Sequence, residues 1–192
     1  MIALSLWTRG DFFAKEDDVG FQFETDYDLD TLTAMGKGLR KTLRKKRSRR
    51  VHIFAAAVVV LGLAVPIAKL LLHQPLGGND AVMLIAVIAV ILTGSFEDRL
   101  NARVAKRRLL PGTQRAGAIF EDDGYTLKTN AAESKWQYDS ILAIAETKRY
   151  FVFALSKNHV QAFDKEGMTG GTLEDFCAFL AEKTGKTIQF VK

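Results

Sequence analysis

The hydrophobic positions of this chain are concentrated in two long stretches, residues 51–72 and 81–96, which a short polar turn separates. A helix rises about 1.5 Å per residue, so roughly 20 apolar residues cross a hydrocarbon layer about 30 Å thick. The first stretch has 22 residues, and its one charge, Lys69, can reach the interface. The second is shorter, so it must thin the bilayer, extend through Glu97 and Asp98, or fall short of spanning. The pattern predicts a transmembrane helical hairpin, and the missing polar stripe argues against a hairpin buried in a soluble core.

Basic residues lie outside both stretches, whereas the turn, residues 73–80, contains neither Lys nor Arg. The positive-inside rule then predicts a multi-pass protein of the cell inner (plasma) membrane with both termini cytoplasmic. Because the charges adjoin the spans, we expect anionic membrane lipid as a partner and no nucleic acid. The predicted lipid-facing basic collar consists of Arg40, Lys41, Arg44, Lys45, Lys46, Arg47, Arg49, Arg50, Arg103, Lys106, Arg107 and Arg108.

The pattern of the N-terminal part, residues 1–50, predicts two short strands and a helix. Residues 2–8 and 19–25 are strand-like and are able to pair as a hairpin. Asp30 or Thr31 is placed to cap a helix, whose apolar positions follow at spacings of three and four. These positions are Leu32, Met35, Leu39 and Leu43. Two arrangements remain open, with this row either on the inner leaflet or packed on the cytosolic domain.

After the hairpin, residues 51–96, a basic helical stalk is expected over residues 97–111, where Pro111 and Gly112 end it. A compact domain, residues 112–192, follows. Turn residues separate six predicted strands, residues 117–121, 125–129, 133–137, 141–147, 150–155 and 159–163. Such short connections require antiparallel neighbours. A capping-box start at Thr172 and a stop at Gly185 predict a final helix, with Leu173, Phe176, Cys177 and Leu180 on its packed face.

This pattern predicts an α+β membrane protein: a transmembrane helical hairpin plus a cytosolic PH-like antiparallel β-barrel or meander with a C-terminal helix. The chain also resembles the YcxB-like family of bacterial membrane proteins. The resemblance rests on residues 26–30 before the basic helix and on a C-terminal tract. That tract contains Trp136, Ile141, Glu146, residues 151–155, Phe163 and Lys165. Asp164-Lys165 stands where many members have Pro-Lys. The resemblance implies the architecture and no enzymatic role.

No set of side chains predicts a catalytic, cofactor or metal site. The three histidines, His52, His73 and His159, are far apart in the sequence and share no ligand spacing with Cys or carboxylates. Cys177 is expected to be a buried hydrophobe rather than a nucleophile. The acidic pairs at 17–18 and 122–123 are expected to face water, and the glycine-rich run 167–171 to form a loop and helix cap. Trp136 and Tyr138 are expected to point inward rather than to form an exposed platform.

Two function classes remain. The first is a non-catalytic membrane protein whose PH-like module binds or regulates at the inner leaflet. Lys128, Lys135, Lys148 and Arg149 are its possible anionic-ligand surface, and scattered surface lysines are the alternative. The second is an accessory subunit of a membrane complex or enzyme, with a site that a protein partner completes.

Overall fold

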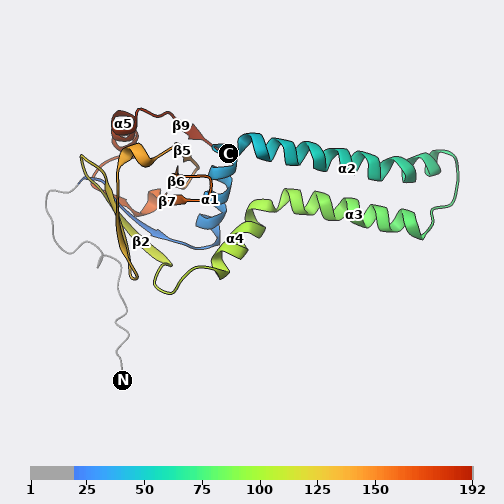
Figure 1. The fold of residues 1–192 in the computed structure, drawn as a ribbon, viewed down its shortest axis with the longest axis horizontal. Helices are drawn as coiled ribbons and strands as arrows, with labels where there is room; N and C mark the ends of the chain where they lie inside the picture. The colour runs from blue at the N-terminus through green and yellow to red at the C-terminus, as the bar shows by residue number, and fades with distance from the viewer. Residues whose placement is uncertain (1–19, 192) are drawn as a thin grey trace, which may run out of the picture.

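The computed structural model describes residues 20–191, in which a helical hairpin projects from a two-sheet domain (Figure 1). The elements before the domain's main part are β1 (Gln22–Asp26), α1 (Leu29–Lys41), α2 (Lys45–Leu71), α3 (Gly78–Ser95) and α4 (Glu97–Arg107). Those that follow are β2 (Arg115–Phe120), β3 (Tyr125–Thr129), β4 (Glu133–Trp136), β5 (Ala143–Glu146), β6 (Tyr150–Ala154), β7 (Val160–Asp164), β8 (Met168–Thr169), α5 (Leu173–Thr184) and β9 (Ile188–Phe190). The predicted α+β class, with an apolar helix pair, antiparallel strands and a C-terminal helix, is confirmed.

The strand that precedes the hairpin belongs to the same sheet as the strands that follow it. One sheet has the order β4-β3-β2-β1-β8, and Phe23 of β1 is opposite both Ala118 of β2 and Met168 of β8. The domain is therefore built from both sides of the hairpin and is not confined to residues 112–192. At Gln22 and Phe23 both edges of β1 are occupied, and the predicted partner strand, residues 2–8, lies outside the described residues.

The second sheet has the order β7-β6-β5-β9. Its first three strands follow one another as predicted, because the β5–β6 and β6–β7 turns are short. The pattern analysis missed β8 and β9, and β9 pairs with β5 in parallel, with Ile144 opposite Ile188. Strands of two or three residues leave too little alternation to be detected.

Aromatic side chains from both sheets and from α5 fill the space between the layers. Phe23, Phe120, Phe151 and Phe163 are essentially unexposed, and Phe176 of α5 contacts the first three. The helix begins as predicted, with Thr172 and Asp175 in a capping box and Gly185 in the left-handed region at its end. Leu173, however, is exposed, so the packed face consists of Phe176 and Leu180, with Cys177 and Phe179 partly buried beside them.

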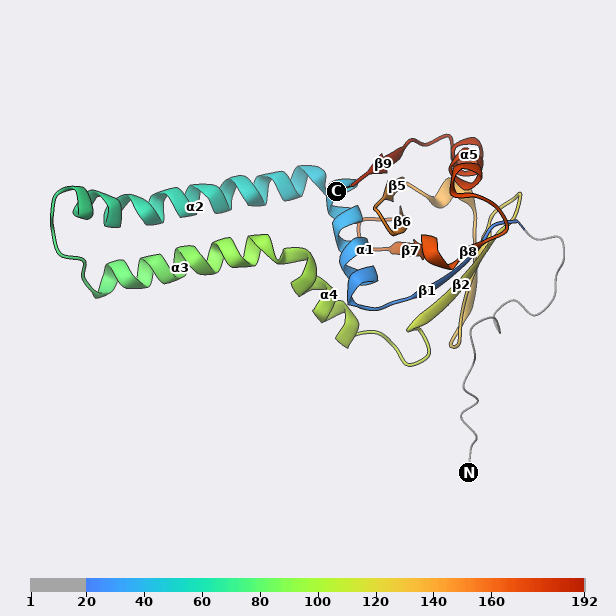
Figure 2. The same ribbon diagram turned by 180° about the vertical axis from the view of Figure 1, so that it is seen from behind.

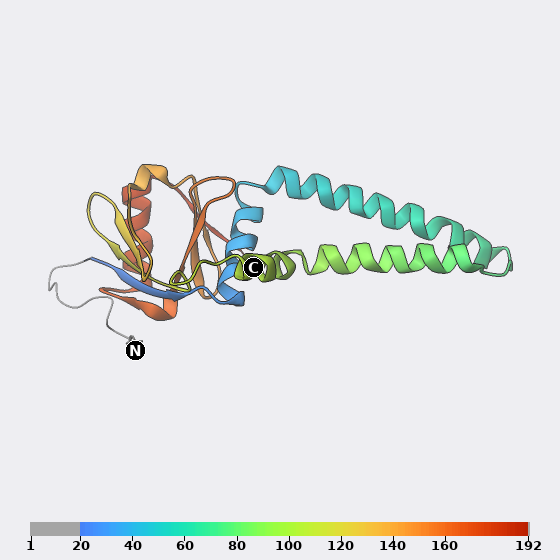
Figure 3. The same ribbon diagram turned by 60° about the horizontal axis from the view of Figure 1, so that its bottom comes forward.

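The opposite end of the domain is covered by α1, so the sheets lie between α5 and α1 (Figure 3). The Asp28 side chain, rather than Asp30 or Thr31, caps α1 by accepting a hydrogen bond from the Thr31 amide at 2.8 Å. Leu32, Ala34 and Leu39 are buried. A Cβ on Gly38 would lie 2.7 Å from Val152 Cγ1, so this helix approaches β6 closely. Of the two open arrangements, the apolar row therefore takes the one packed on the domain.

Two helices, α2 and α3, are long and apolar enough to span a membrane, and their surfaces are largely exposed (Figure 2). Gly62 lets them approach, since a Cβ there would lie 2.6 Å from Val87 Cγ2. Asp80 stabilises the first turn of α3 by accepting from the Gly77 amide. The Lys69 ammonium, in the last turn of α2, pairs with Asp80 in the first turn of α3 at 2.8 Å. The first helix also begins earlier than residue 51, so the basic run 45–50 forms its first turns.

Candidate binding site at the base of the hairpin

An ion pair joins the helices on the two sides of the hairpin at its base. The Arg40 guanidinium of α1 donates to both carboxylate oxygens of Asp98 in α4, with Nε 2.9 Å from Oδ1. Both side chains are largely shielded from solvent, and the hydrogen bond to Asp98 raises the pKa of Arg40 above its usual value. A two-pronged, partly buried pair of this kind fixes orientation as well as distance. It therefore holds α4 against α1.

A second arginine joins the start of α2 to the domain. Arg44 Nε donates to the Lys157 carbonyl and Arg44 Nη2 to Asn158 Oδ1, each at 2.8 Å. Lys157 and Asn158 form the turn between β6 and β7. The base of the hairpin is thus attached to the domain at two places rather than by a free stalk.

These contacts separate the residues of the predicted basic collar into two groups. Arg40 and Arg44 have partners within the protein, so they serve the architecture and are not free to face lipid. The others have exposed side chains around the base of the hairpin, namely Lys41, Lys45, Lys46, Arg47, Arg49, Arg50, Arg103, Lys106, Arg107 and Arg108. The collar prediction thus loses two of its members.

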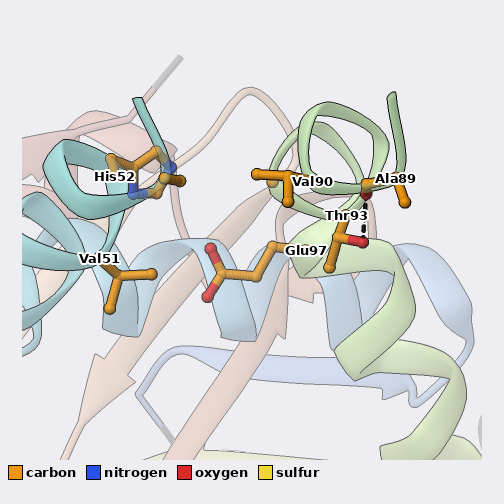
Figure 4. Close-up of a pocket in the computed structure, with 8 residues that line it drawn as sticks. Val51, His52, Ala89, Val90, Thr93 and Glu97 are labelled. Atoms are coloured by element: carbon orange, nitrogen blue, oxygen red, sulfur yellow. Dashed lines mark hydrogen bonds between the residues drawn. The ribbon is translucent and has the colours of Figure 1, made fainter. Parts of the chain in front are cut away.

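An apolar cavity of about 420 Å³ lies between α2 and α3 near the base of the hairpin. Figure 4 shows Val51 and His52 of α2 on one side and Val90 and Thr93 of α3 on the other, with the Glu97 carboxylate between them. His52 Nδ1 lies 2.8 Å from the Ser48 carbonyl oxygen, and Thr93 Oγ1 donates to the Ala89 carbonyl. Polar groups therefore line only the end of this cavity nearest the domain.

A more polar cavity of about 340 Å³ adjoins the first and shares Val51 and Glu97 with it. Its other walls come from α1, the start of α2 and α4, including the paired Arg40 and Asp98 and the exposed Arg47. Neither cavity was foreseen from the sequence, because Val51 and Glu97, which line both, are far apart along the chain.

A third cavity, of about 600 Å³, is the most basic of the set, and we call it the basic pocket. Its cations are Lys37 of α1, Arg99 of α4, and Lys148 and Arg149 of the β5–β6 turn, and Asp30 is the acid in its lining. The exposed Phe190 and the buried Val191 complete one wall. Within residues 20–191, Lys37, Arg99 and Lys148 form no ion pair with an acid. The pocket is suited to an anionic group.

Arg149 differs from the other cations of the pocket because it is held by acids. It donates to Asp164 from Nη2 at 2.7 Å and lies 3.4 Å from Glu166. The hydrogen bonds to Asp164 raise its pKa above the usual arginine value. Asp164, in turn, accepts a hydrogen bond from the Glu166 amide, so its side chain stabilises the turn after β7. Arg149 therefore fixes the position of one pocket wall, and its charge is already paired with Asp164 and Glu166.

The predicted anionic-ligand surface is therefore split. Lys148 and Arg149 line the basic pocket, whereas Lys128 and Lys135 lie on β3 and β4 of the other sheet. Lys128 is 3.9 Å from Glu133, its neighbour across the strands. Sequence reasoning missed Lys37 and Arg99 as pocket residues. A signal existed for Lys37, because Asp30, Ala34 and Lys37 fall on one helical face.

Several other candidates behave as ordinary structural residues. Burial raises the pKa of the Cys177 thiol, which disfavours the reactive thiolate. Asp122 is exposed and pairs with Lys183, and the Tyr138 hydroxyl donates to the Glu121 and Gly124 carbonyls from a buried position. The glycine-rich run is packed on β1, since a Cβ on Gly167 would collide with the Glu24 carbonyl oxygen. It thus forms β8 and a turn, not a phosphate-binding loop.

Fold and site together define a class of protein: a two-sheet α+β domain, interrupted after its first strand by two helices apolar enough to span a membrane, with cavities at the junction. A family model described as YcxB-like protein matches residues 120–180, from the end of β2 to the middle of α5. The match confirms the resemblance over that segment, and it includes neither β1 nor the hairpin. No curated protein and no solved structure matched the chain.

Proposed function

We propose that this chain is a non-catalytic integral membrane protein of the cell inner (plasma) membrane. In this proposal α2 and α3 cross the bilayer, both termini are cytoplasmic, and the two-sheet domain is a PH-like module. The module binds an anionic ligand, the head group of a membrane lipid, at the inner leaflet.

The PH-like assignment is supported by the order of the elements. Two sheets of consecutive antiparallel strands enclose one aromatic core, and a C-terminal helix contributes Phe176 and Leu180 to it. The departures are the strand β9 after that helix and the insertion of the hairpin between β1 and β2.

The topology is supported by the pairing of β1 with β2. These strands are hydrogen-bonded neighbours, yet the hairpin lies between them in the chain, so both flanks of the hairpin must be on the same side of a membrane. An even number of crossings satisfies this condition, and the basic flanks favour the cytoplasmic side. The exposed apolar surface of α2 and α3 would be costly in water and is stable in lipid.

The observation that carries the binding role is the place of the basic pocket. Arg99 is in the first turn of α4, directly after the second candidate span, and Lys37 is in the last turns of α1 before the first. With α2 and α3 across the bilayer, as proposed, the pocket would lie at the level where lipid head groups begin. Each Lys or Arg near an anionic leaflet contributes about 1 kcal/mol to attraction.

Native mass spectrometry of the full chain in detergent tests this role, with phosphatidylglycerol and phosphatidylcholine as the added probes. We expect the protein to retain phosphatidylglycerol preferentially. Changing Lys37, Arg99 and Lys148 to Gln should abolish the preference. The matched control replaces Lys128, Lys135 and Lys186, which removes the same charge elsewhere and should leave the preference intact. Equal loss in both variants would argue for general electrostatic attraction and against a pocket.

One observation favours the accessory-subunit alternative. Strand β4 is at the end of its sheet, and a cavity of about 470 Å³ lies beside it, lined by Tyr125, Lys135 and Trp136 among others. An edge strand next to a cavity is suited to the addition of a strand from a protein partner. A stoichiometric protein that copurifies with the full chain, and is lost when a proline replaces Lys135, would support this second role.

A further inference from the structure

The helix α4 presents an apolar stripe whose side chains remain about half exposed among residues 20–191. Phe96, just before its first turn, and Leu100 and Val104 are 49%, 41% and 49% exposed. They are spaced by four residues, so they lie along one side of the helix. Ala102, on the opposite side, is only 1% exposed and is packed towards α1.

Basic side chains border the apolar stripe. Counting 3.6 residues per turn, Arg103 and Arg107 lie beside Leu100 on the helix surface, and Arg99 is further round the same side. All three are exposed. Apolar side chains flanked by arginines are typical of helices that lie in the interface of a membrane, where guanidinium groups reach phosphates.

The position of α4 directs this stripe away from the domain. α1 packs on β5, β6 and β7 with one side and on α4 with another, so α4 is the outer layer at the end where the hairpin leaves. Figures 1 and 2 both show α4 turning sharply from the direction of α3 and running across that end. The four-residue series extends back into α3, since Leu92 is 50% exposed and precedes Phe96, the residue between the two helices, by four positions.

We propose that α4 is an amphipathic helix embedded in the interface of the inner leaflet, with Leu100 and Val104 in the apolar boundary and Arg103 and Arg107 among the head-group phosphates. The inference rests on the proposed function, because it requires α2 and α3 to cross the bilayer. It adds a second contact with the membrane, which would fix the tilt of the domain and the height of the basic pocket above the lipid. A protein partner is disfavoured, because the same series of exposed apolar side chains begins within a candidate span, at Leu92.

Depth-dependent quenching in liposomes tests the proposal on the full chain. In a Cys177→Ala background, single cysteines replace Leu100, Val104, Lys106, Leu173 or Phe54, and each is labelled with an environment-sensitive fluorophore. Leu173 is the matched control, since it is 37% exposed but lies on α5, at the far end of the domain. Phe54 of α2 reports on the hairpin itself. The liposomes contain phosphatidylglycerol and lipids with a spin label high in the acyl chain.

We expect strong quenching at residues 54, 100 and 104, with residue 106 close to the low level of residue 173. An apolar face about 5–10 Å below the head-group boundary would be within reach of such a quencher. Quenching at residue 54 with residues 100 and 104 at the level of residue 173 overturns this inference alone. Absence of quenching at residue 54 overturns the proposed membrane function and the inference with it.

Discussion

The helices α1 and α4 flank the hairpin and are both amphipathic and basic, yet they have opposite surroundings. In α1 the apolar row is buried against the second sheet, and Leu39 is only 7% exposed. In α4 the apolar row is exposed, and its opposite side is packed towards α1. A helical pattern therefore predicts that a face will be covered but does not specify by what. Here the second sheet, through β5, β6 and β7, covers the apolar row of α1, and α4 is one layer further out.

The strongest test of this difference between α1 and α4 places a charge in the apolar row of each helix. Leu39→Asp puts a carboxylate into the packed side of α1, where lost burial and desolvation should cost several kcal/mol. Leu100→Asp places the same group on an exposed side and should leave the domain's unfolding temperature almost unchanged. Thermal unfolding of the full chain in detergent, followed by tryptophan emission in a Trp7→Phe background so that only Trp136 reports, compares them. Equal destabilisation would show that α4 is packed on the domain as tightly as α1.

Two glycines of α1 sharpen the comparison within a single helix. A methyl group on Gly38 would collide with Val152, whereas on Gly36 its nearest neighbour is Asp98 Oδ1 at 4.0 Å. Gly38→Ala should therefore destabilise the domain by about 1–3 kcal/mol through overpacking. Gly36→Ala should instead stabilise it by up to about 1 kcal/mol through helix propensity. If denaturant unfolding gives the same sign for both variants, the close approach of α1 to β6 is wrong.

The ion pair between Arg40 of α1 and Asp98 of α4 should have a measurable coupling energy. A double-mutant cycle with Arg40→Ala and Asp98→Ala isolates their interaction. For a charged, two-pronged and partly buried pair we expect a coupling of about 1–2 kcal/mol. Lys128 and Glu133, an exposed pair 3.9 Å apart, form the control cycle and should couple by less than about 1 kcal/mol. Coupling no larger than the control would mean that α4 is not fixed to α1 by this contact.

Local patterns predicted most strands, and long-range pairing could not be predicted from them. Residues 125–129 were foreseen as β3 because turn residues bound a short alternating run. The place of β1 was not foreseen, since Phe23 meets Ala118 across the whole hairpin and no local signal encodes that register. A fragment of residues 112–192, which the sequence predicts as a separate domain, would lack Phe23 at the centre of the core.

In the candidate site, too, local features were predicted from the sequence and contacts between distant segments were not. Clustering of basic residues around the hairpin was visible in the sequence, but the partners of Arg40 and Arg44 depend on tertiary contacts. Lys148 was predicted as part of an anionic-ligand surface and lines the basic pocket, whereas its neighbours there, Lys37 and Arg99, come from segments on the two sides of the hairpin. Spatial proximity of this kind follows from the β1–β2 pairing, which composition and spacing do not reveal.

The smallest expected effect concerns Cys177 on α5, at the end of the domain away from both helices. Because burial raises the pKa of its thiol, the reactive thiolate is scarce near neutral pH. A maleimide should therefore label the native chain slowly, and faster as the pH rises towards that pKa. Labelling in denaturant is the control and should be rapid. Fast labelling of the folded chain at pH 7 would contradict the packing of α5.

The central claim is that the hairpin crosses the membrane while both of its flanks stay in the cytoplasm. Labelling of intact cells with a membrane-impermeant maleimide tests it most directly, in a Cys177→Ala background with Leu76→Cys in the turn or Glu182→Cys on α5. Both positions are exposed. The account predicts labelling at residue 76 in intact cells, and at residue 182 only after the membrane is permeabilised. Labelling of residue 182 in intact cells, or of residue 76 only after permeabilisation, would contradict it.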